Sequence, residues 1–510
     1  MTPRFYLTTP IYYATGEPHI GHAYTTFLAD TLARYHRQTG ADVHFLTGTD
    51  EHGQKVQEEA ARRGVAPQTL CDEMAQRFRW AWEELDISFD RFIRTTESDH
   101  VAVVQEFLTR LHDRGHIYAD QYVGWYCVHE ERYWTEKDLG PDQSCPDCGR
   151  PVRQIQEKNY FFRMSAFQEP LLRHIQENPQ WIFPESRRNE VLGFLQKPLG
   201  DLSISRPVSR ISWGVPLPFD PEHITYVWVD ALINYVTGSN HFRQVGEGLE
   251  EGDDSWWPAQ LHLLGKDIVT THAVYWPTLL LAAGLPLPQR LLVHGWWVMG
   301  DTKMSKSLGN VVDPLELRER YGTDAVRWYL LREMPTGGDA SYDPERFRSR
   351  YDELANILGN LMSRTLSMVG KYRGGVVPPS GARALDAQIE EAIRQFREAM
   401  EAFRVHEALG VAMDLARAGN GYVETAAPWS LARDPKAQEE LDETLATLTH
   451  LLAALAALLY PVLPGKMEEV ARALGLSRPP TLPELPALKL GGTHVSTPSP
   501  LFPRNVHPDV

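Results

Sequence analysis

The chain has 510 residues, of which 43% are hydrophobic and 23% charged, a composition typical of a folded globular protein and not of a disordered one. This length allows about two to four domains with well-buried cores. The net charge of −16 argues against a protein that binds nucleic acid over its whole surface, so any such contact needs a local basic region.

Nothing in the sequence predicts export or a membrane span. The first residues lack the charged, apolar and small-residue succession of a signal peptide. The longest apolar run, 451–460, has about half the length that a bilayer span needs and is followed by Pro461, so we expect a core helix. We therefore expect a cytoplasmic protein without membrane contact.

A strand, a turn and a helix open the chain. The apolar run 5–13 predicts the strand, residues 14–18 the turn and residues 23–36 the helix. At the helix start lie His19, Gly21 and His22, where free N–H groups suit a phosphate and glycine permits close approach. The two imidazoles, three residues apart, can face one ligand. A plain helix start with two half-exposed histidines is the other interpretation.

The next elements continue the alternation of strands and helices. Residues 43–48 form an apolar run typical of a buried strand, and residues 55–63 and 68–85 have helical periodicity. Asp50 follows that strand, so we expect its carboxylate at the carboxyl edge of the sheet, where such folds bind ligands. A carboxylate at this place can hold an ammonium group.

Three of the four cysteines lie in a segment, about 116–212, that breaks the alternation. Cys145 and Cys148 form a Cys-x-x-Cys knuckle, and Cys127 precedes them across a hairpin-like stretch. This spacing is typical of structural zinc, which needs a fourth ligand. A metal-free knuckle with reduced thiols is the alternative. Cys71, in a helical stretch, is expected to be a buried, inert thiol.

The alternation resumes after about residue 212. Strands are predicted at 225–229, 261–265 and 291–294, and a parallel sheet split by an inserted domain explains this order. Several aromatic side chains are expected at strand ends or on the following helices: Tyr13, Trp228, Tyr235 and His272. Aromatics of this kind are often core filler, but their clustering favours an apolar pocket, which suits a thioether.

A loop rich in glycine, lysine and serine follows the last of these strands. Lys303, Ser305 and Lys306 lie in it between two glycines. Two ammonium groups three residues apart suit a triphosphate, whose charge needs neutralising most when pyrophosphate leaves. Alone, such a loop is more often solvated surface. Its occurrence together with the histidine helix start favours ATP binding.

The chain is predicted to be almost wholly helical from about residue 345. Leu/Ala-rich periods with breaks near 378–379, 428 and 461–464 predict a helical bundle, and a proline-rich tail follows residue 478. One predicted helix carries a run of cationic residues: Arg346, Arg348, Arg350, Arg364, Lys371 and Arg373. This run offers a local basic surface, although charge runs are more often plain solvated faces.

Two motifs, His19-Ile20-Gly21-His22 and Lys303-Met304-Ser305-Lys306-Ser307, together resemble the signature of class I aminoacyl-tRNA synthetases. Residues 226–232, 264–268, 356–364 and 427–429 resemble the methionyl-tRNA synthetases in particular, so that the similarity covers nearly the whole chain. The resemblance implies an α/β fold: a Rossmann-type parallel sheet split by an inserted zinc-knuckle domain, followed by a C-terminal α-helical bundle.

The resemblance also implies an activity. A member of this family activates L-methionine with ATP and Mg²⁺, forming methionyl-adenylate and pyrophosphate. It then transfers the methionyl group to the 3′-terminal adenosine of initiator and elongator tRNA(Met). The expected partners are therefore ATP, L-methionine and tRNA(Met), and we expect a monomer.

Residues that match the family's motifs take on expected roles. The methionine pocket would consist of Ile11, Tyr13, Asp50, Trp228, Ala231, Tyr235 and His272. ATP would contact His19, Gly21, His22, Gly265, Asp267, Lys303, Ser305 and Lys306, with His19, His22, Lys303 and Lys306 as the catalytic group. The anticodon would be recognised by Asn360, Arg364 and Trp429, which are otherwise a capped helix and a core tryptophan.

The cysteine knuckle departs from the family pattern. Many members have Cys-x-x-Cys in its first half, but here Glu130 stands at the second cysteine. Zinc would then bind Cys127, Cys145 and Cys148, with His129 or Glu130 as the fourth ligand.

The expected organisation follows the chain. Residues 1–115 and 213–290 form the two halves of the catalytic Rossmann domain, 116–212 the insertion, 291–344 the Lys-Ser loop and stem-contact region, 345–478 the anticodon-binding bundle and 479–510 the tail. Three alternatives stay open: a cysteinyl-type synthetase, an adenylate-forming ligase that uses no tRNA, and a binding protein descended from a synthetase.

Overall fold

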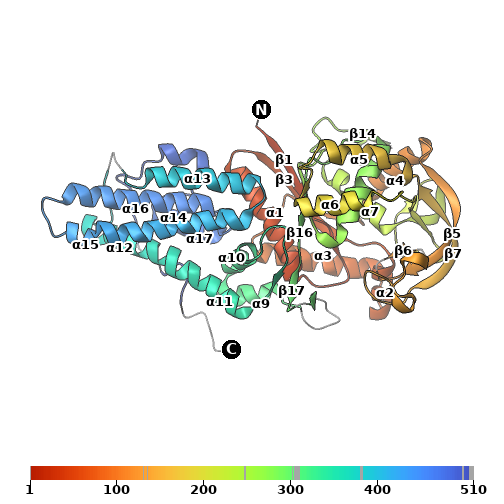
Figure 1. Cartoon of the computed structure of the whole chain (residues 1–510), viewed down its shortest axis with the longest axis horizontal. Helices are drawn as coiled ribbons and strands as arrows, with labels where there is room; N and C mark the ends of the chain where they lie inside the picture. The colour runs from red at the N-terminus through yellow and green to blue at the C-terminus, as the bar shows by residue number, and fades with distance from the viewer. Residues whose placement is uncertain are drawn as a thin grey trace.

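The computed structural model describes residues 2–129, 131–134, 136–245, 248–300, 302–303, 311–379, 383–496 and 499–504. A helical bundle, a parallel sheet flanked by helices and a lobe of antiparallel strands follow one another along the longest axis (Figure 1). The bundle is the C-terminal part of the chain, and the lobe is formed by residues between the two halves of the sheet.

The central sheet is parallel and has the order β2-β3-β1-β15-β16-β8, with β4 paired to β3. Its strands are β1 (Arg4–Thr8), β2 (Tyr12–Tyr13), β3 (Asp42–Asp50), β4 (Arg91–Arg94), β8 (Ile182–Phe183), β15 (Leu261–Gly265) and β16 (Leu291–His294). The prediction of a split parallel sheet is confirmed. β8 comes from the 116–212 segment, so that segment supplies one strand of the sheet itself.

Both faces of the sheet are covered by helices. Adjacent strand residues point to opposite sides, so Leu263 packs in the cluster that contains α1 and α3, and Leu264 in the cluster that contains α4, α7 and α8. The helices of this region are α1 (Ile20–Gln38), α2 (Gln54–Arg63), α3 (Pro67–Glu84), α4 (Ser98–Asp113), α7 (Val227–Gly238) and α8 (Trp276–Ala283). A π-helical turn, Thr271–Tyr275, leads into α8. Cys71 is fully buried in α3, as expected.

One predicted strand is wrong. The run 225–229 was expected to be extended, but β12 ends at Thr225 and α7 begins at Val227. A continuous apolar run fits a buried helix as well as a buried strand, and every residue of α7 except Trp228 is buried. Trp228 therefore projects from a helix that is otherwise enclosed, and not from a strand end.

The lobe is built on an antiparallel sheet of order β6-β5-β7-β9. Its strands are β5 (Ile117–Cys127), β6 (Arg132–Trp134), β7 (Arg153–Phe162) and β9 (Leu202–Ser203). The same part of the chain forms smaller sheets and helices: β10 (Ser205–Pro207), β11 (Pro216–Leu217), β12 (Asp220–Thr225), β13 (Phe242–Val245), β14 (Gly248–Glu251), α5 (Gln168–Glu177) and α6 (Glu185–Phe194). The strands β17 (Trp297–Met299), β18 (Thr302–Lys303) and β19 (Ala340–Ser341) form a further small sheet after β16.

The helical region predicted from about residue 345 is confirmed. Its helices are α11 (Pro344–Glu353), α12 (Asn360–Arg373), α13 (Asp386–Glu401), α14 (Val405–Ala426), α15 (Pro428–Leu431), α16 (Gln438–Leu459) and α17 (Pro464–Ala473). Two further helices, α9 (Pro314–Tyr321) and α10 (Thr323–Glu333), precede it. A π-helical segment, Leu354–Gly359, joins α11 to α12, so the cationic run lies on one continuous helical path, as expected. In the tail, Leu482, Leu485 and Phe502 are buried against the bundle.

Among the described residues, one helix is long and apolar enough to cross a membrane. This helix is α16, and 89% of its apolar window is buried inside the protein. It packs against α12, α13, α14 and α17. The apolar run 451–460 is therefore the core of the bundle, as the sequence predicted.

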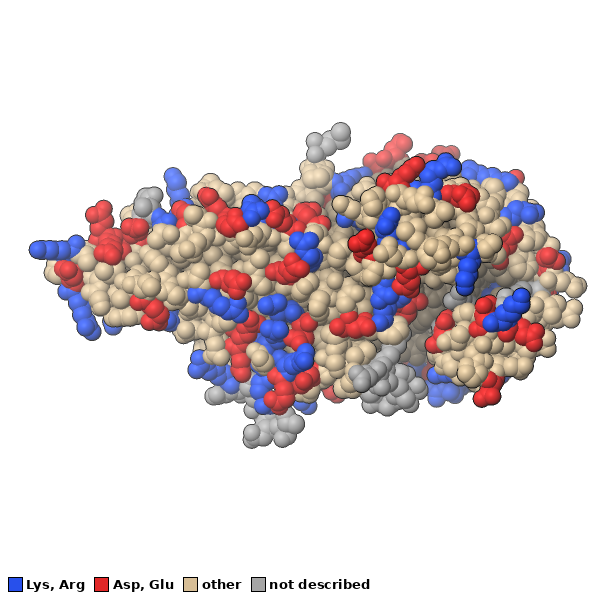
Figure 2. All heavy atoms as spheres, in the orientation of Figure 1, with Lys and Arg blue, Asp and Glu red and all other residues tan. Residues whose placement is uncertain are grey.

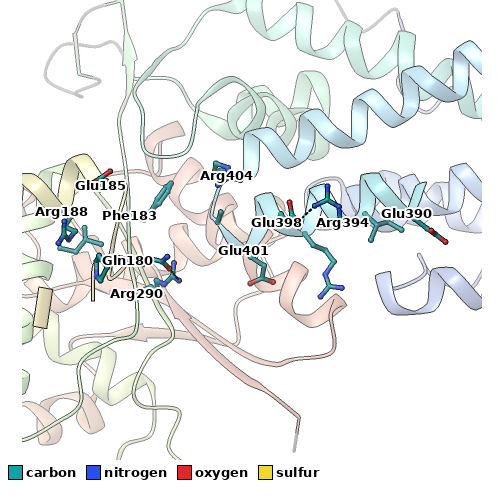
Figure 3. A pocket seen from close by; sticks show the side chains of 15 residues that line it. Gln180, Phe183, Glu185, Arg188, Arg290, Glu390, Arg394, Glu398, Glu401 and Arg404 are labelled. Atoms are coloured by element: carbon teal, nitrogen blue, oxygen red, sulfur yellow. Dashed lines mark hydrogen bonds and ion pairs between the residues drawn. The ribbon is translucent and has the colours of Figure 1, made fainter. Parts of the chain in front are cut away.

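The sheet and the bundle share a core and a buried ion pair. Asp30 on α1 accepts from Arg327 on α10 at 2.6 Å, and Arg327 also donates to the carbonyl oxygen of Val462 at 2.9 Å. On another side, a groove of about 960 Å³ separates β8 from α13. Figure 3 shows Phe183 and Arg290 on one wall of the groove and Glu401 and Arg404 on the other.

Candidate active site

A cavity of about 590 Å³ opens at the carboxyl edge of the sheet. Its wall contains the start of α1, the ends of β2, β3, β15 and β16, and one side of α7. His129 and Arg150 of the antiparallel lobe also line it. Figure 2 shows a hollow between this lobe and the central part of the molecule. The edge predicted to bind ligands is therefore the edge that carries the cavity.

The start of α1 forms one wall. His19 is the N-cap residue, and its Nδ1 accepts from the Gly21 N–H at 3.0 Å. The rings of His19 and His22 are stacked 3.8 Å apart, and both line the cavity. A Cβ atom at Gly21 would lie 2.8 Å from the His19 ring, so glycine is needed here for the histidine cap itself. Both imidazoles therefore line the same cavity.

An apolar recess lies beside this wall. Its lining includes every residue predicted for the methionine side chain: Ile11, Tyr13, Trp228, Ala231, Tyr235 and His272. Tyr13 and Trp228 meet edge to face, with ring centroids 6.3 Å apart. The structure therefore brings these residues together from β2, α7 and the π-helical turn before α8.

His272 is neutral in this recess. Burial lowers the pKa of His272 to about 4. Its Nδ1 donates to the carbonyl oxygen of Ile268 at 3.0 Å, so Nε2 is left to accept from the Tyr235 hydroxyl at 2.7 Å. This orientation places an aromatic wall with a fixed polar tip in the pocket, and no positive charge.

Asp50 carries a buried carboxylate at the end of β3. Its side chain is 4% exposed, and its Oδ1 has no hydrogen-bond partner among the described residues. Burial raises the pKa of Asp50 well above its usual range, and the nearby carboxylates of Asp230 and Glu131 raise it further, while Lys55 lowers it. An unpartnered carboxylate oxygen facing a cavity is suited to a cationic ligand group.

Gly265, the last residue of β15, and Asp267, which follows it, also line the cavity. A Cβ atom at Gly265 would lie 2.7 Å from Asp267 Oδ1, so glycine gives that carboxylate its space. Trp296 donates from Nε1 to the same oxygen at 3.3 Å. Both predicted nucleotide residues are therefore in the same cavity as the α1 start.

Further lining residues were missed by the sequence reasoning: Lys55, Thr25, His294 and Trp296. His294 ends β16 and contacts Thr25 Oγ1 through Nε2 at 2.8 Å. His294 ends a predicted strand, as Asp50 follows one, so the same argument would have predicted its place at the ligand-binding edge of the sheet. Lys55 lies at the start of α2, and its ammonium is 4.4 Å from the centre of the Tyr13 ring.

The Lys-Ser loop is only partly within the described residues. Lys303 is in β18, whose backbone pairs with β17, while Ser305 and Lys306 lie outside the described part of the chain.

The three knuckle thiols converge. The sulfur atoms of Cys127, Cys145 and Cys148 all lie within 4.8 Å of one another, and Cys127 and Cys148 are 3.6 Å apart. Zn–S bonds of about 2.3 Å in a tetrahedron place sulfurs about 3.8 Å apart, so the donor set fits zinc. Within the described residues no fourth metal-type ligand atom joins this group. His129 contacts Arg150 instead, and Glu130 lies outside the described residues.

The predicted anticodon residues lie at the far end of the bundle. Arg364 on α12 pairs with Glu424 near the end of α14 at 2.7 Å. Trp429 on α15 follows a left-handed residue, Ala427, and is 38% exposed. Asn360 begins α12, and Figure 1 places the α12 and α15 labels beside each other at this end. Trp429 is therefore not a core tryptophan.

The cationic run on α11 and α12 is largely paired. Arg346 and Arg350 contact Glu333, and Arg373 contacts Asp442. Figure 2 shows both charges intermixed over the region of α11. The run does not form an unbroken basic surface.

Comparison with known proteins identifies the family. A family model described as tRNA synthetases class I (M) matches residues 5–366, and one described as the anticodon binding domain of methionyl tRNA ligase matches residues 374–505. The chain belongs to the methionyl-tRNA synthetase family. A methionine--tRNA ligase of Caldanaerobacter subterraneus subsp. tengcongensis is 43% identical over 99% of this chain and 79% of the relative.

Further family members agree. A methionine--tRNA ligase of Bacillus subtilis is 43% identical over 98% of this chain and 78% of its own length. Among solved structures, Mycobacterium tuberculosis methionyl-tRNA synthetase in complex with methionyl-adenylate superposes with a TM-score of 0.94. It is 40% identical, and the match covers 99% of this chain and all of that one. The methionyl-tRNA synthetase fold thus extends over the whole chain.

Proposed function

We propose that this member of the methionyl-tRNA synthetase family activates L-methionine with ATP and transfers the methionyl group to tRNA(Met). One observation carries the proposal. The histidine start of α1, the aromatic recess and the unpartnered Asp50 carboxylate line a single cavity, so a nucleotide phosphate and an amino acid can be held side by side.

The amino acid is recognised at both of its ends. Asp50 accepts the α-ammonium group, whose positive charge satisfies the buried Oδ1. The thioether lies against the recess formed by Ile11, Tyr13, Trp228, Ala231, Tyr235 and His272. Neutral His272 and the Tyr235 hydroxyl form the polar tip near a weakly accepting sulfur.

ATP occupies the remaining part of the cavity. His19, Gly21 and His22 contact its phosphates at the helix start, and Gly265 and Asp267 contact the nucleoside. Lys303, Ser305 and Lys306 are proposed to close over the triphosphate. Mg²⁺ bound with ATP supplies further positive charge to the phosphates.

The reaction is an in-line displacement. A carboxylate oxygen of methionine attacks the α-phosphorus of ATP, the bond to the bridging oxygen breaks, and pyrophosphate leaves. Methionyl-adenylate is the product, and a ribose hydroxyl of the terminal adenosine of tRNA then takes the acyl group while AMP leaves. The protein needs no nucleophile of its own, because it positions reactants and neutralises charge.

The parts of the chain have separate tasks in this proposal. Residues 1–115 and 213–290 hold the substrates, 116–212 covers the cavity, and 291–344 carries the Lys-Ser loop. The bundle, 345–478, presents Asn360, Arg364 and Trp429 to unstacked anticodon bases. The described part of the tail, 479–496 and 499–504, packs on the bundle. We propose a cytoplasmic monomer that charges both initiator and elongator tRNA(Met).

Zinc is proposed as a structural ion of the knuckle. Cys127, Cys145 and Cys148 would hold it, with His129 or Glu130 as the fourth ligand. Metal analysis of protein purified without chelator should give close to one equivalent of zinc. Less than about a tenth of an equivalent would exclude this role.

Charging of purified tRNA(Met) with radiolabelled methionine tests the function as a whole. The proposal requires methionyl-tRNA to accumulate only when ATP, methionine and tRNA(Met) are all present. Formation of methionyl-adenylate without any charging of tRNA would instead support the adenylate-forming ligase.

A further inference from the structure

We propose that Glu131 is a positioning residue for the amino-acid site: its buried carboxylate caps α2 and so holds Lys55 against the Tyr13 wall of the methionine pocket. The inference rests on the proposed function, because it concerns how the same pocket binds methionine. It assigns a task to a residue of the cysteine-bearing hairpin that is not itself a metal ligand candidate.

Glu131 is built into the structure in an unusual way. It lies between β5 and β6, has a φ of +50°, and is 1% exposed. A buried carboxylate in a left-handed backbone conformation costs free energy unless its contacts compensate. The hairpin pairing of Cys127 with Arg132 and of Trp125 with Trp134 holds this residue in place.

The contacts of Glu131 are with α2. Its Oε1 accepts from the Gln54 N–H at 2.5 Å and from the Lys55 N–H at 3.2 Å. These are the first N–H groups of α2, whose N-cap Gly53 provides no side chain and whose first turn has no acidic residue. Glu131 therefore supplies from another segment both the missing cap and the negative charge that a helix start favours.

The chain makes room for this carboxylate. Gly53 has a φ of +101°, and a Cβ atom there would lie 2.7 Å from Glu131 Oε1. Glycine is thus required at this position twice, for its backbone conformation and for the approach of the carboxylate. The fit indicates a specific joint between the lobe and α2, and not a chance contact.

The contact between Glu131 and α2 lies next to the methionine pocket. Lys55 is the second residue of α2, and its ammonium lies 4.4 Å from the centre of the Tyr13 ring, a cation–π distance. Tyr13 in turn meets Trp228 edge to face across the recess. Loss of the cap would free the first turn of α2, and with it the cation that fixes the Tyr13 ring.

The same joint affects the electrostatics of the α-ammonium site. Burial raises the pKa of Asp50, and Lys55 lowers it. Displacing Lys55 would therefore favour the protonated form of the carboxyl group that has to hold an ammonium. Both effects weaken methionine binding, and neither acts on the ATP side of the cavity at the α1 start.

The test compares Glu131→Ala, Glu131→Gln and Lys55→Met with the wild-type chain, with Glu136→Ala as a control on an exposed acidic residue of the same lobe. Methionine-dependent ATP–pyrophosphate exchange gives KM for methionine and for ATP separately. We expect Glu131→Ala to raise KM for methionine about tenfold or more and to change KM for ATP by less than about twofold. Glu131→Gln, whose amide oxygen still accepts the two N–H groups, should stay within about threefold of wild type.

Titration of methionine binding by tryptophan fluorescence provides a readout that needs no catalysis. If the cap acts through Lys55, Lys55→Met also weakens methionine binding. A double variant that combines Glu131→Ala with Lys55→Met then binds methionine no more weakly than the single variant with the lower affinity. The proposal is overturned if Lys55→Met binds methionine like wild type, or if the loss of methionine affinity in the double variant equals the product of the two single losses. It is also overturned if Glu131→Ala raises KM for methionine and KM for ATP equally. Absence of methionine-dependent exchange in the wild-type chain would refute the proposed function instead.

Discussion

The carboxylate of Asp230 accepts a hydrogen bond from His52 Nδ1 at 2.7 Å. Its second oxygen accepts from His100 Nε2 at 2.8 Å, so Asp230 is satisfied on both sides although it is fully buried. His52 follows β3 by two residues, and β3 ends at Asp50. Asp230 belongs to α7, which carries Trp228. The pair therefore joins the ammonium site to the side-chain pocket.

Replacing this carboxylate should loosen the pocket. Burial alone would raise the pKa of Asp230, but the two histidines lower it to about 2, so the side chain is ionised at neutral pH. In Asp230→Asn, both histidines lose their charged acceptor and one of them faces an amide NH₂ group instead, so we expect KM for methionine to rise about tenfold or more. KM for ATP should change little. Steady-state pyrophosphate exchange measures both, and an unchanged KM for methionine would contradict the role of the pair.

Binding of methionine should release protons from Asp50. Burial raises the pKa of this carboxyl in the free protein, while an α-ammonium group binds to its ionised form. Affinity for methionine is therefore expected to fall as the pH is lowered. Calorimetric titration in buffers of different ionisation enthalpy measures the released protons, and Asp50→Asn should abolish both the release and most of the affinity.

His272 should make stability depend on pH in a defined window. Its pKa is about 4 in the folded protein and about 6.5 when exposed, so the unfolded chain binds more protons between these values. The free energy of unfolding therefore rises with pH between about 4 and 6.5. This one residue contributes up to about 3 kcal/mol of that rise. The difference in Tm between pH 7.5 and pH 5 should be smaller in His272→Asn. The same Tm difference in the variant and in wild type would show that other titratable groups determine the pH dependence of stability.

Trp429 should matter for tRNA and not for adenylate formation. Its exposed ring at the end of the bundle is available to stack on a base, which is worth about 1–3 kcal/mol. Trp429→Ala is therefore expected to raise KM for tRNA(Met) about tenfold or more, while methionine-dependent pyrophosphate exchange stays near wild type. Equal losses in both assays would indicate a structural defect.

The sequence predicted much of this site because its signals were local. Asp50 could be placed at the sheet edge from the strand before it, and His19 and His22 from the helix start. The strand expected at 225–229 failed because its apolar run has no period that separates a buried helix from a buried strand. The segment forms a helix that is buried on nearly all sides by other parts of the chain, and no local sequence pattern predicts this burial.

Other features depend on contacts between distant segments and could not be predicted. Glu131 caps the helix that begins with Gln54 and Lys55. These two residues precede Glu131 by 77 and 76 positions in the chain. The buried pair of Asp30 and Arg327 spans an even longer separation, 297 residues. Neither sequence neighbourhood contains a motif. The cysteines were predicted to converge because their spacing is itself the motif.

Amino-acid-dependent ATP–pyrophosphate exchange, run with each of the twenty amino acids, tests the central claim most directly. The pocket described above predicts strong exchange with methionine and none with cysteine, isoleucine, valine or leucine above the level of the amino-acid-free control. Exchange supported best by another amino acid would contradict the assignment of the aromatic recess, and exchange with none would contradict the activity itself.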